Sequence, residues 1–130
     1  MATTTVSKLK AKLDKLFSQW IRIKDADDNG MVNCFTCGSH KHWKDMHAGH
    51  FMSRRHHSTR WDETNVQVQC PKCNLFNQGE QYKFGLYLDQ KFGEGTAYEV
   101  EYRSKVITKL SRVDYQEAID NVKKKLKSFL

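Results

Sequence analysis

The chain has 130 residues, which fits a single domain over 1–130, and 38% of them are hydrophobic, enough for a small core. A mean hydropathy of −0.76 and the lack of a long apolar run exclude a membrane span, and the first ten residues lack the apolar core of a signal peptide, so we do not expect secretion. The formal net charge of +7 suggests an anionic partner, most often nucleic acid.

Apolar periodicity predicts a helix near the N-terminus, over residues 5–24. Apolar side chains recur there at steps of three and four, and the helix should end before the turn cluster at residues 27–30. We therefore treat residues 1–25 as a basic amphipathic segment. The apolar positions are Val6, Leu9, Leu13, Leu16, Phe17, Trp20 and Ile23.

The middle of the chain, residues 31–79, is expected to contain short strands and polar loops. Strands are predicted at residues 31–33, 46–51 and 66–69, the last because apolar and polar residues alternate there. Residues 52–65 show no periodicity and predict a loop. A helix should begin near Pro71 and break at Gly79.

The last part of the chain, residues 80–130, is expected to be helical. A helix is predicted over residues 82–92, closed by the glycine that follows. The segment from Thr96 has both capping-box spacing and strand-like alternation, and we favour the helix. A final helix is predicted to start at Asp114 and to carry an apolar stripe as far as Leu130. The expected fold is α+β, with a ββα unit between terminal helices.

The four cysteines form two Cys-x-x-Cys pairs. Such pairs match a tetrahedral four-cysteine zinc site, in which each short turn offers two sulfurs to one ion. A disulfide framework would need an oxidising compartment, and a thioredoxin-like site would need one pair rather than two. We therefore expect structural Zn²⁺, with free buried thiols as the alternative. The expected ligands are Cys34, Cys37, Cys70 and Cys73.

All six histidines lie between residues 40 and 57, inside the loop that the cysteine pairs would close. Hydrolysis of a phosphodiester needs a base that activates water and a cation that neutralises charge at phosphorus. Histidine suits the base because its pKa lies near neutrality. An imidazole or an amide oxygen can hold the ion. His40 and His42 are expected to be solvated in a polar loop, which leaves the later histidines as candidates for this chemistry.

Five stretches resemble those of the phage NinG/Rap recombination proteins, over roughly residues 15–95. They are Ser18–Arg22, Cys34–Gly38, His47–Arg54, Gln69–Asn74 and Gly79, in this order. His50, Asn65 and Asn74 also fall at the positions of the HNH nuclease motif, and phage endonuclease VII looks like a more distant relative. The resemblance implies a small ββα-metal core (HNH, or His-Me finger) with a four-cysteine structural zinc, wrapped by N- and C-terminal helices.

The resemblance also implies a function. It suggests a metal-dependent endodeoxyribonuclease that hydrolyses phosphodiesters in branched recombination intermediates, such as Holliday junctions, in the cytoplasm of the bacterial host. His50 would be the general base and Asn65 the structural asparagine of the motif. Asn74 and His47 would bind the catalytic Mg²⁺ or Mn²⁺. Because a four-way junction has two-fold symmetry, a homodimer with two active sites is the economical arrangement.

One position departs from the motif. HNH enzymes commonly have Asp or His directly before the base, and this chain has Gly49 there. The candidates for the missing ligand are Asp45, His47, His56 and His57. His47 would share a strand face with His50 only if the strand were irregular, and the reverse assignment, with His47 as the base and His50 as a ligand, is also open.

Basic residues suggest where DNA would bind. Arg54, Arg55 and Arg60 are candidate phosphate contacts, because guanidinium forks match phosphate geometry, and surface ion pairs are the alternative. Residues 1–25 carry a net charge of +4 and residues 103–130 carry +5, whereas the middle carries −2. The terminal segments could track DNA, form a dimer or present solvated helix faces.

Two other functions share many of these features. An HNH nuclease of the restriction or nicking type would have the same site and prefer particular duplex sequences. A non-catalytic zinc module that binds nucleic acid would share the cysteines and the charge. That module would give no reason for His50 and Asn74 to stand at nuclease spacing.

Overall fold

The computed structural model describes residues 5–129 as a mixed α+β fold of helices and two small sheets, which confirms the predicted class. Leu130 and the first four residues of the predicted N-terminal segment lie outside this range. In chain order the elements are α1 (Val6–Ile23), β1 (Met31–Asn33), β2 (His40–His42), η1 (Trp43–Asp45), β3 (His47–His50), α2 (His57–Arg60), β4 (Val66–Gln69), η2 (Lys72–Phe76), α3 (Gln81–Phe92), α4 (Thr96–Ser104) and α5 (Arg112–Lys127). None of the helices in the described range is long and apolar enough to cross a membrane.

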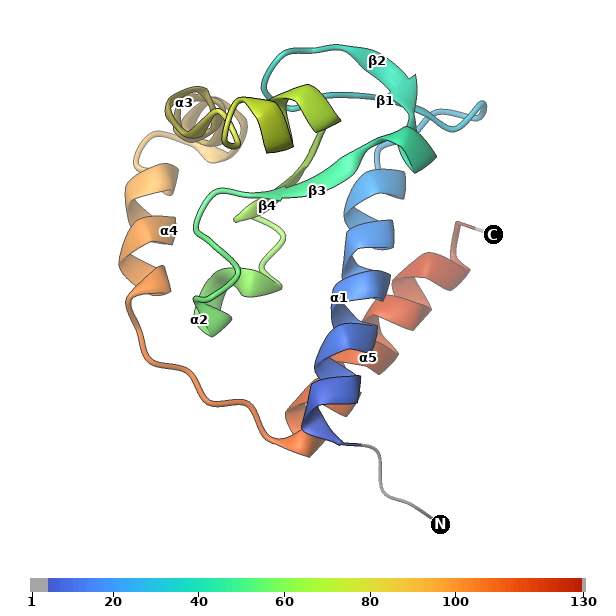
Figure 1. Cartoon of the computed structure of the whole chain (residues 1–130), viewed down its shortest axis with the longest axis vertical. Coiled ribbons are helices and arrows are strands. Elements are labelled where there is room, and N and C mark those ends of the chain that lie inside the picture. Colours follow the sequence, from blue (N-terminus) through green and yellow to red (C-terminus); the bar gives the residue numbers. More distant parts are fainter. Residues whose placement is uncertain (1–4, 130) are drawn as a thin grey trace.

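The strands form two antiparallel pairs, of which β1 and β2 lie at the upper edge of the view in Figure 1, above β3 and β4. Strand β1 pairs with β2, and β3 pairs with β4 in a regular register that sets His47 opposite Gln69 and His50 opposite Val66. The chain then turns through η2 into α3. The helix expected between Pro71 and Gly79 is the short η2, and α3 corresponds to the helix predicted over residues 82–92.

The first and last helices pack against each other and form the larger core, although they are separated by most of the chain (Figure 1). Strand β4 contributes Val66 to this core. The buried members are Leu9, Leu13, Phe17, Ile21, Val66, Tyr115, Ile119, Val122 and Leu126. The two basic ends of the chain are therefore neighbours, and hydrogen bonding and repulsion from Lys123 lower the pKa of the exposed Lys12.

Three details of the central region differ from the sequence-based expectations. His40 and His42 belong to β2 rather than to a loop, because this short strand pairs with β1. Residues 57–60 form the single turn of α2 within the expected loop, where Ser58 donates a hydrogen bond to the carbonyl of Arg103. All four residues of β4 are buried, so the alternation does not mark a solvent-facing side.

Helix α4 begins at Thr96, in agreement with the helix favoured from the sequence, although Thr96 is not its cap, whereas α5 begins two residues before the expected start at Asp114. Helix α4 begins after Gly95, and Thr96 donates a hydrogen bond to the carbonyl of Gly93 instead of capping. Helix α5 is capped by Ser111, whose hydroxyl accepts from the backbone N–H of Asp114, while the Asp114 carboxylate accepts from the backbone of Ser111. Asp114 is thus the third residue of this helix and completes a capping box.

Candidate functional site

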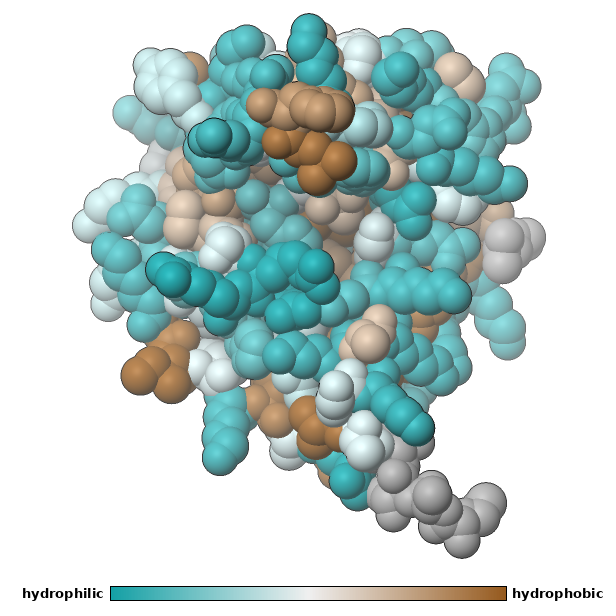
Figure 2. All heavy atoms as spheres, viewed as in Figure 1, coloured by the Kyte–Doolittle hydropathy of each residue, from teal (hydrophilic) through white to brown (hydrophobic). Residues whose placement is uncertain are grey.

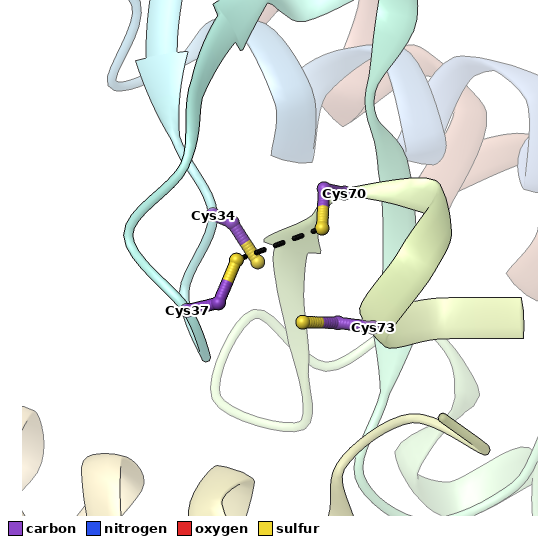
Figure 3. A group of neighbouring side chains, drawn as sticks. All are labelled: Cys34, Cys37, Cys70 and Cys73. Carbon is purple, nitrogen blue, oxygen red and sulfur yellow. Dashed lines mark hydrogen bonds between the residues drawn. The ribbon is translucent and has the colours of Figure 1, made fainter. Parts of the chain in front are cut away.

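The four cysteines converge at one point from two turns (Figure 3). Cys34 and Cys37 follow β1, Cys70 follows β4 and Cys73 lies in η2. Their sulfur atoms all lie within 4.8 Å of one another, and the sulfurs of Cys37 and Cys70 are 3.7 Å apart. Tetrahedral zinc with Zn–S bonds of about 2.3 Å holds its sulfurs about 3.8 Å apart. The cluster therefore fits one zinc ion.

The electrostatics of this cluster also favour a cation. Burial opposes ionisation of Cys34, but hydrogen bonds from Thr36 and from nearby backbone lower its pKa to about 6. Burial, reinforced by neighbouring thiols, raises the pKa of Cys73 to about 12. Several thiolates can share so small a volume only when a metal ion neutralises their repulsion. Within the described residues no second group of three or more His, Cys, Asp or Glu side chains has comparable geometry.

His50 stands at the end of β3 with a defined tautomer. Its Nε2 lies 3.0 Å from the carbonyl oxygen of Arg60. Because a carbonyl only accepts, Nε2 carries the proton, and Nδ1 of the neutral ring is free to accept one. Burial lowers the pKa of His50, and the positive charges of Arg54 and Arg60 lower it further, against the effect of the carbonyl. The imidazole is therefore neutral at pH 7, as a general base must be.

An open cavity of about 380 Å³ brings His50 together with Arg54 and Asn74. The three residues come from β3, from the loop after it and from η2. Asn74 directly follows Cys73, so the turn that completes the cysteine cluster also positions this amide beside the histidine. The arrangement combines a base, an amide and a guanidinium in one open cavity, which is a chemistry suited to a phosphate group.

His47 contacts Asn74 but does not line the cavity that contains His50. The Asn74 side-chain nitrogen lies 3.0 Å from Nδ1 of His47 and donates to it in this orientation. The regular register of β3 means that side chains alternate, so His47 and His50 point to opposite faces of the strand. Ala48, rather than His47, shares the cavity lining with His50. Asn74 is thus the link between His47 and the cavity.

The packing of Gly49 explains why no larger residue precedes His50. A Cβ atom at this position would lie 1.8 Å from Oε1 of Gln69, which is itself fully buried. The amide nitrogen of Gln69 donates to the hydroxyl of Thr36 and to the carbonyl of Gly79, so the side chain cannot easily move away. Gln69 Oε1 has no hydrogen-bond partner in the described part of the chain. An aspartate or histidine at position 49 is therefore incompatible with this arrangement.

Asn65 is fully buried and fastens the loop that joins β3 to β4. Its Oδ1 accepts from the backbone N–H of Met52 at 2.7 Å, and its Nδ2 donates to the carbonyls of Met52 and Thr59. Its backbone carbonyl accepts from Phe51. These bonds fix the chain on both sides of the loop that carries Arg54 and Arg60. Asn65 therefore acts on the shape of the site and does not line its cavity.

The three candidate arginines have different environments. Arg60, with a side chain only 12% exposed, is bound by Asp14 of α1, whereas Arg54 is 60% exposed and makes a single 2.8 Å contact with the same carboxylate. Arg55 is exposed and lines another cavity, together with His56 and other residues. Only Arg54 of the three is both exposed and beside His50 and Asn74.

Sequence reasoning missed Asp14, Gln69 and Trp61. The Asp14 carboxylate also accepts from the indole N–H of Trp61 at 2.8 Å, and burial is outweighed by its hydrogen bonds, so the pKa of Asp14 is lowered. Asp14 is an isolated acidic residue among the lysines of the first helix, and this pattern could have marked it as a partner for a basic side chain. Of the other candidates for the missing ligand, Asp45 is exposed in η1, and His56 and His57 line the cavity of Arg55, away from Asn74.

A comparison with protein families gave one match. The sequence model described as "Bacteriophage Lambda NinG protein" matches residues 1–129, and so includes both the cysteine cluster and the cavity. Neither curated proteins nor solved structures gave a match.

Proposed function

Because the chain belongs to the bacteriophage lambda NinG family, we propose that it is a metal-dependent endonuclease that cuts branched DNA during phage recombination in the host cytoplasm. The observation that carries this proposal is the cavity lined by His50, Arg54 and Asn74, beside the turn that contains Cys73. We also propose that the site is of the HNH type and that the substrate is a four-way junction.

In this proposal His50 takes the proton from the attacking water. Its Nδ1 is the free nitrogen, because Nε2 is bound to the carbonyl of Arg60. Burial lowers the pKa of the ring, so it is unprotonated at neutral pH. Removing such a base typically slows hydrolysis by about 10²- to 10⁴-fold.

In this proposal Arg54 and Asn74, which line the same cavity as His50, hold the phosphate, and His47 acts from outside that lining through its contact with Asn74. The Arg54 side chain is exposed, and within the described residues its guanidinium pairs only with the Asp14 carboxylate. If this contact breaks, the guanidinium can bind the phosphate in the cavity. Asn74 Nδ2 lies 3.0 Å from Nδ1 of His47. The two side chains would hold Mg²⁺ or Mn²⁺ once the Asn74 amide rotates and presents its oxygen to the ion. When bound, this ion would neutralise charge that develops at phosphorus.

DNA outside the cavity would meet the paired basic helices. Exposed lysines of α5 stand next to those of α1, so the two ends that carry +4 and +5 form one positive region. Such a region binds the backbone of any sequence and therefore suits recognition by shape. Two opposing cuts in a junction require two active sites, which leads us to propose a homodimer.

The substrate is tested with end-labelled four-way junction and linear duplex of the same sequence, with and without added Mg²⁺. We omit a chelator, because it would also strip zinc from the cysteines. The proposal predicts Mg²⁺-dependent cuts near the branch and little cutting of the duplex. Sequence-specific cutting of the duplex would favour a restriction-type nuclease instead, and binding without cutting under any divalent ion would favour a zinc module that only binds DNA.

A further inference from the structure

Two adjacent large apolar side chains are exposed on η2, directly after Asn74. Leu75 is 61% exposed and Phe76 is 81% exposed. Figure 2 shows hydrophobic atoms gathered over η2, near the top of the view, within a largely hydrophilic surface. Single exposed apolar residues are common on proteins, but a contiguous pair beside a candidate active site calls for a reason.

The backbone holds this pair outward. Cys73 anchors the start of the turn in the cysteine cluster, and the backbone N–H of Gly79 donates to the Cys73 carbonyl at 2.7 Å. Gln78 and Glu80 adopt positive φ angles of 54° and 50°, a conformation that non-glycine residues take only when the surroundings enforce it. The tip therefore cannot fold back onto the protein without breaking these contacts.

The protein's own core does not need these side chains. Phe84 of α3, eight residues after Phe76, is fully buried against the rings of Phe35 and Phe51. Leu75 and Phe76 thus form an outward tip on a rigid, internally packed support. We call this pair the apolar tip.

The charge around the apolar tip points to an anionic partner. Lys72 and Lys83, on either side of the tip in sequence, are both exposed, and Arg54 lies across the cavity that Asn74 and Gln78 line. A second copy of the chain is a poor fit, since two side chains fall far short of the roughly 800 Å² that each partner buries in a standard interface. Nucleic acid combines a charged backbone with apolar base faces that stack on aromatic rings.

We propose that Leu75 and Phe76 form a wedge that stacks on an unpaired base at a DNA branch point, next to the strand held in the cavity. This inference rests on the proposed function, because a phosphate beside Asn74 brings its attached nucleoside to the tip. In intact duplex each base face is covered by its neighbours, and exposing one costs free energy. At a branch this cost is lowest, so the wedge selects branched DNA over duplex.

The test measures affinity for four-way junction and for matched linear duplex in a His50→Ala background without added Mg²⁺, so that no strand is cut. Phe76→Ala should reduce the preference for junction by roughly 10- to 100-fold and leave duplex binding unchanged. Phe76→Trp should keep the preference. Ile107→Ala is the matched control, since Ile107 is 98% exposed in the segment between α4 and α5, well away from η2 (Figure 1).

Zinc content and circular dichroism establish that Phe76→Ala is folded. An unchanged junction preference in folded Phe76→Ala overturns the wedge, as does absence of DNA binding or conversion of a dimer into a monomer by this substitution. Cleavage by protein with His50 intact is measured separately with Mg²⁺. If the protein cleaves the junction and Phe76→Ala leaves the junction preference unchanged, the wedge proposal alone is overturned. If junction binding depends on Phe76 but no cleavage occurs, the endonuclease proposal alone is overturned.

Discussion

Asp14 holds Arg60 through both of its carboxylate oxygens, although 46 residues separate the two in sequence. Oδ1 accepts from Nε at 3.0 Å and Oδ2 from Nη2 at 2.5 Å. The carbonyl of Arg60 in turn accepts from Nε2 of His50. Helix α1, which lies outside both strand pairs, is thus connected to the candidate base through one arginine.

Asp14→Asn should weaken both the fold and the site. The variant leaves a largely buried guanidinium short of its partner, so we expect the free energy of unfolding to fall by about 1–3 kcal/mol. The Arg60 carbonyl would be less well fixed, and DNA cleavage should slow by about 10-fold, which corresponds to about 1.4 kcal/mol in the barrier. Urea denaturation and single-turnover cleavage measure the two effects. Asp120→Asn, at an exposed position of α5, is the control and should change neither.

Cleavage should depend on pH through His50. Burial lowers the pKa of His50, so the ring should be neutral above about pH 6.5. In that range the cleavage rate constant, corrected for the effects of hydroxide and of the metal ion, should not change with pH. As pH falls from there through the lowered pKa, the base becomes protonated and the rate should decline. The same protonation is easier in the unfolded chain, so the contribution of neutral His50 to stability is complete above about pH 6.5 and is lost as pH falls. A rate that increases below pH 6 would contradict this role.

The cysteine cluster should contain one zinc ion per chain. Cys73→Ser removes a buried ligand, and we expect loss of the zinc together with cooperative folding, because structural zinc binding is coupled to folding and contributes about 10–16 kcal/mol in small zinc domains. Mass spectrometry of the native protein and thermal unfolding provide the measurement. Four thiols that react freely in folded, metal-free protein would show that the cluster does not need an ion.

The contact between Gly49 and Gln69 predicts a non-additive pair of substitutions. Gly49→Ala should lower the free energy of unfolding by about 1–3 kcal/mol, because its Cβ overlaps Oε1 of Gln69. In the Gly49→Ala/Gln69→Ala double variant the overlap is gone, so the loss should be smaller than the sum of the single losses. Gly38→Ala, which has positive φ but open space, reports backbone strain alone. Strict additivity would show that the overlap relaxes at no cost.

Sequence patterns predicted the parts of this protein that depend on local periodicity or fixed spacing. The apolar stripe of α1 and the two cysteine pairs are of this kind, since helix geometry and zinc coordination impose regular intervals. The burial of Gln69 could not be predicted, because its hydrogen-bond partners Thr36 and Gly79 come from other segments. Asp14 was missed for the same reason, since its partner Arg60 is adjacent only after folding.

The structure also refines the candidate site. Arg54, Arg55 and Arg60 look equivalent in sequence, yet only tertiary packing distinguishes the buried Arg60 from the exposed Arg54. The alternation of β3 likewise separates His47 from His50, and the link between His47 and the cavity depends on Asn74 from η2. Such relations depend on how segments far apart in sequence meet.

The central claim is that His50 activates water for DNA cleavage, and single-turnover cleavage of a four-way junction by His50→Ala tests it most directly. His40→Ala is the matched control, because His40 is an exposed histidine of β2. With Mg²⁺ present and zinc retained in all proteins, we predict that His50→Ala is slower than wild type by about 10²- to 10⁴-fold, while its affinity for the junction and the rate of His40→Ala are unchanged. Cleavage by zinc-loaded His50→Ala at the wild-type rate would contradict the claim.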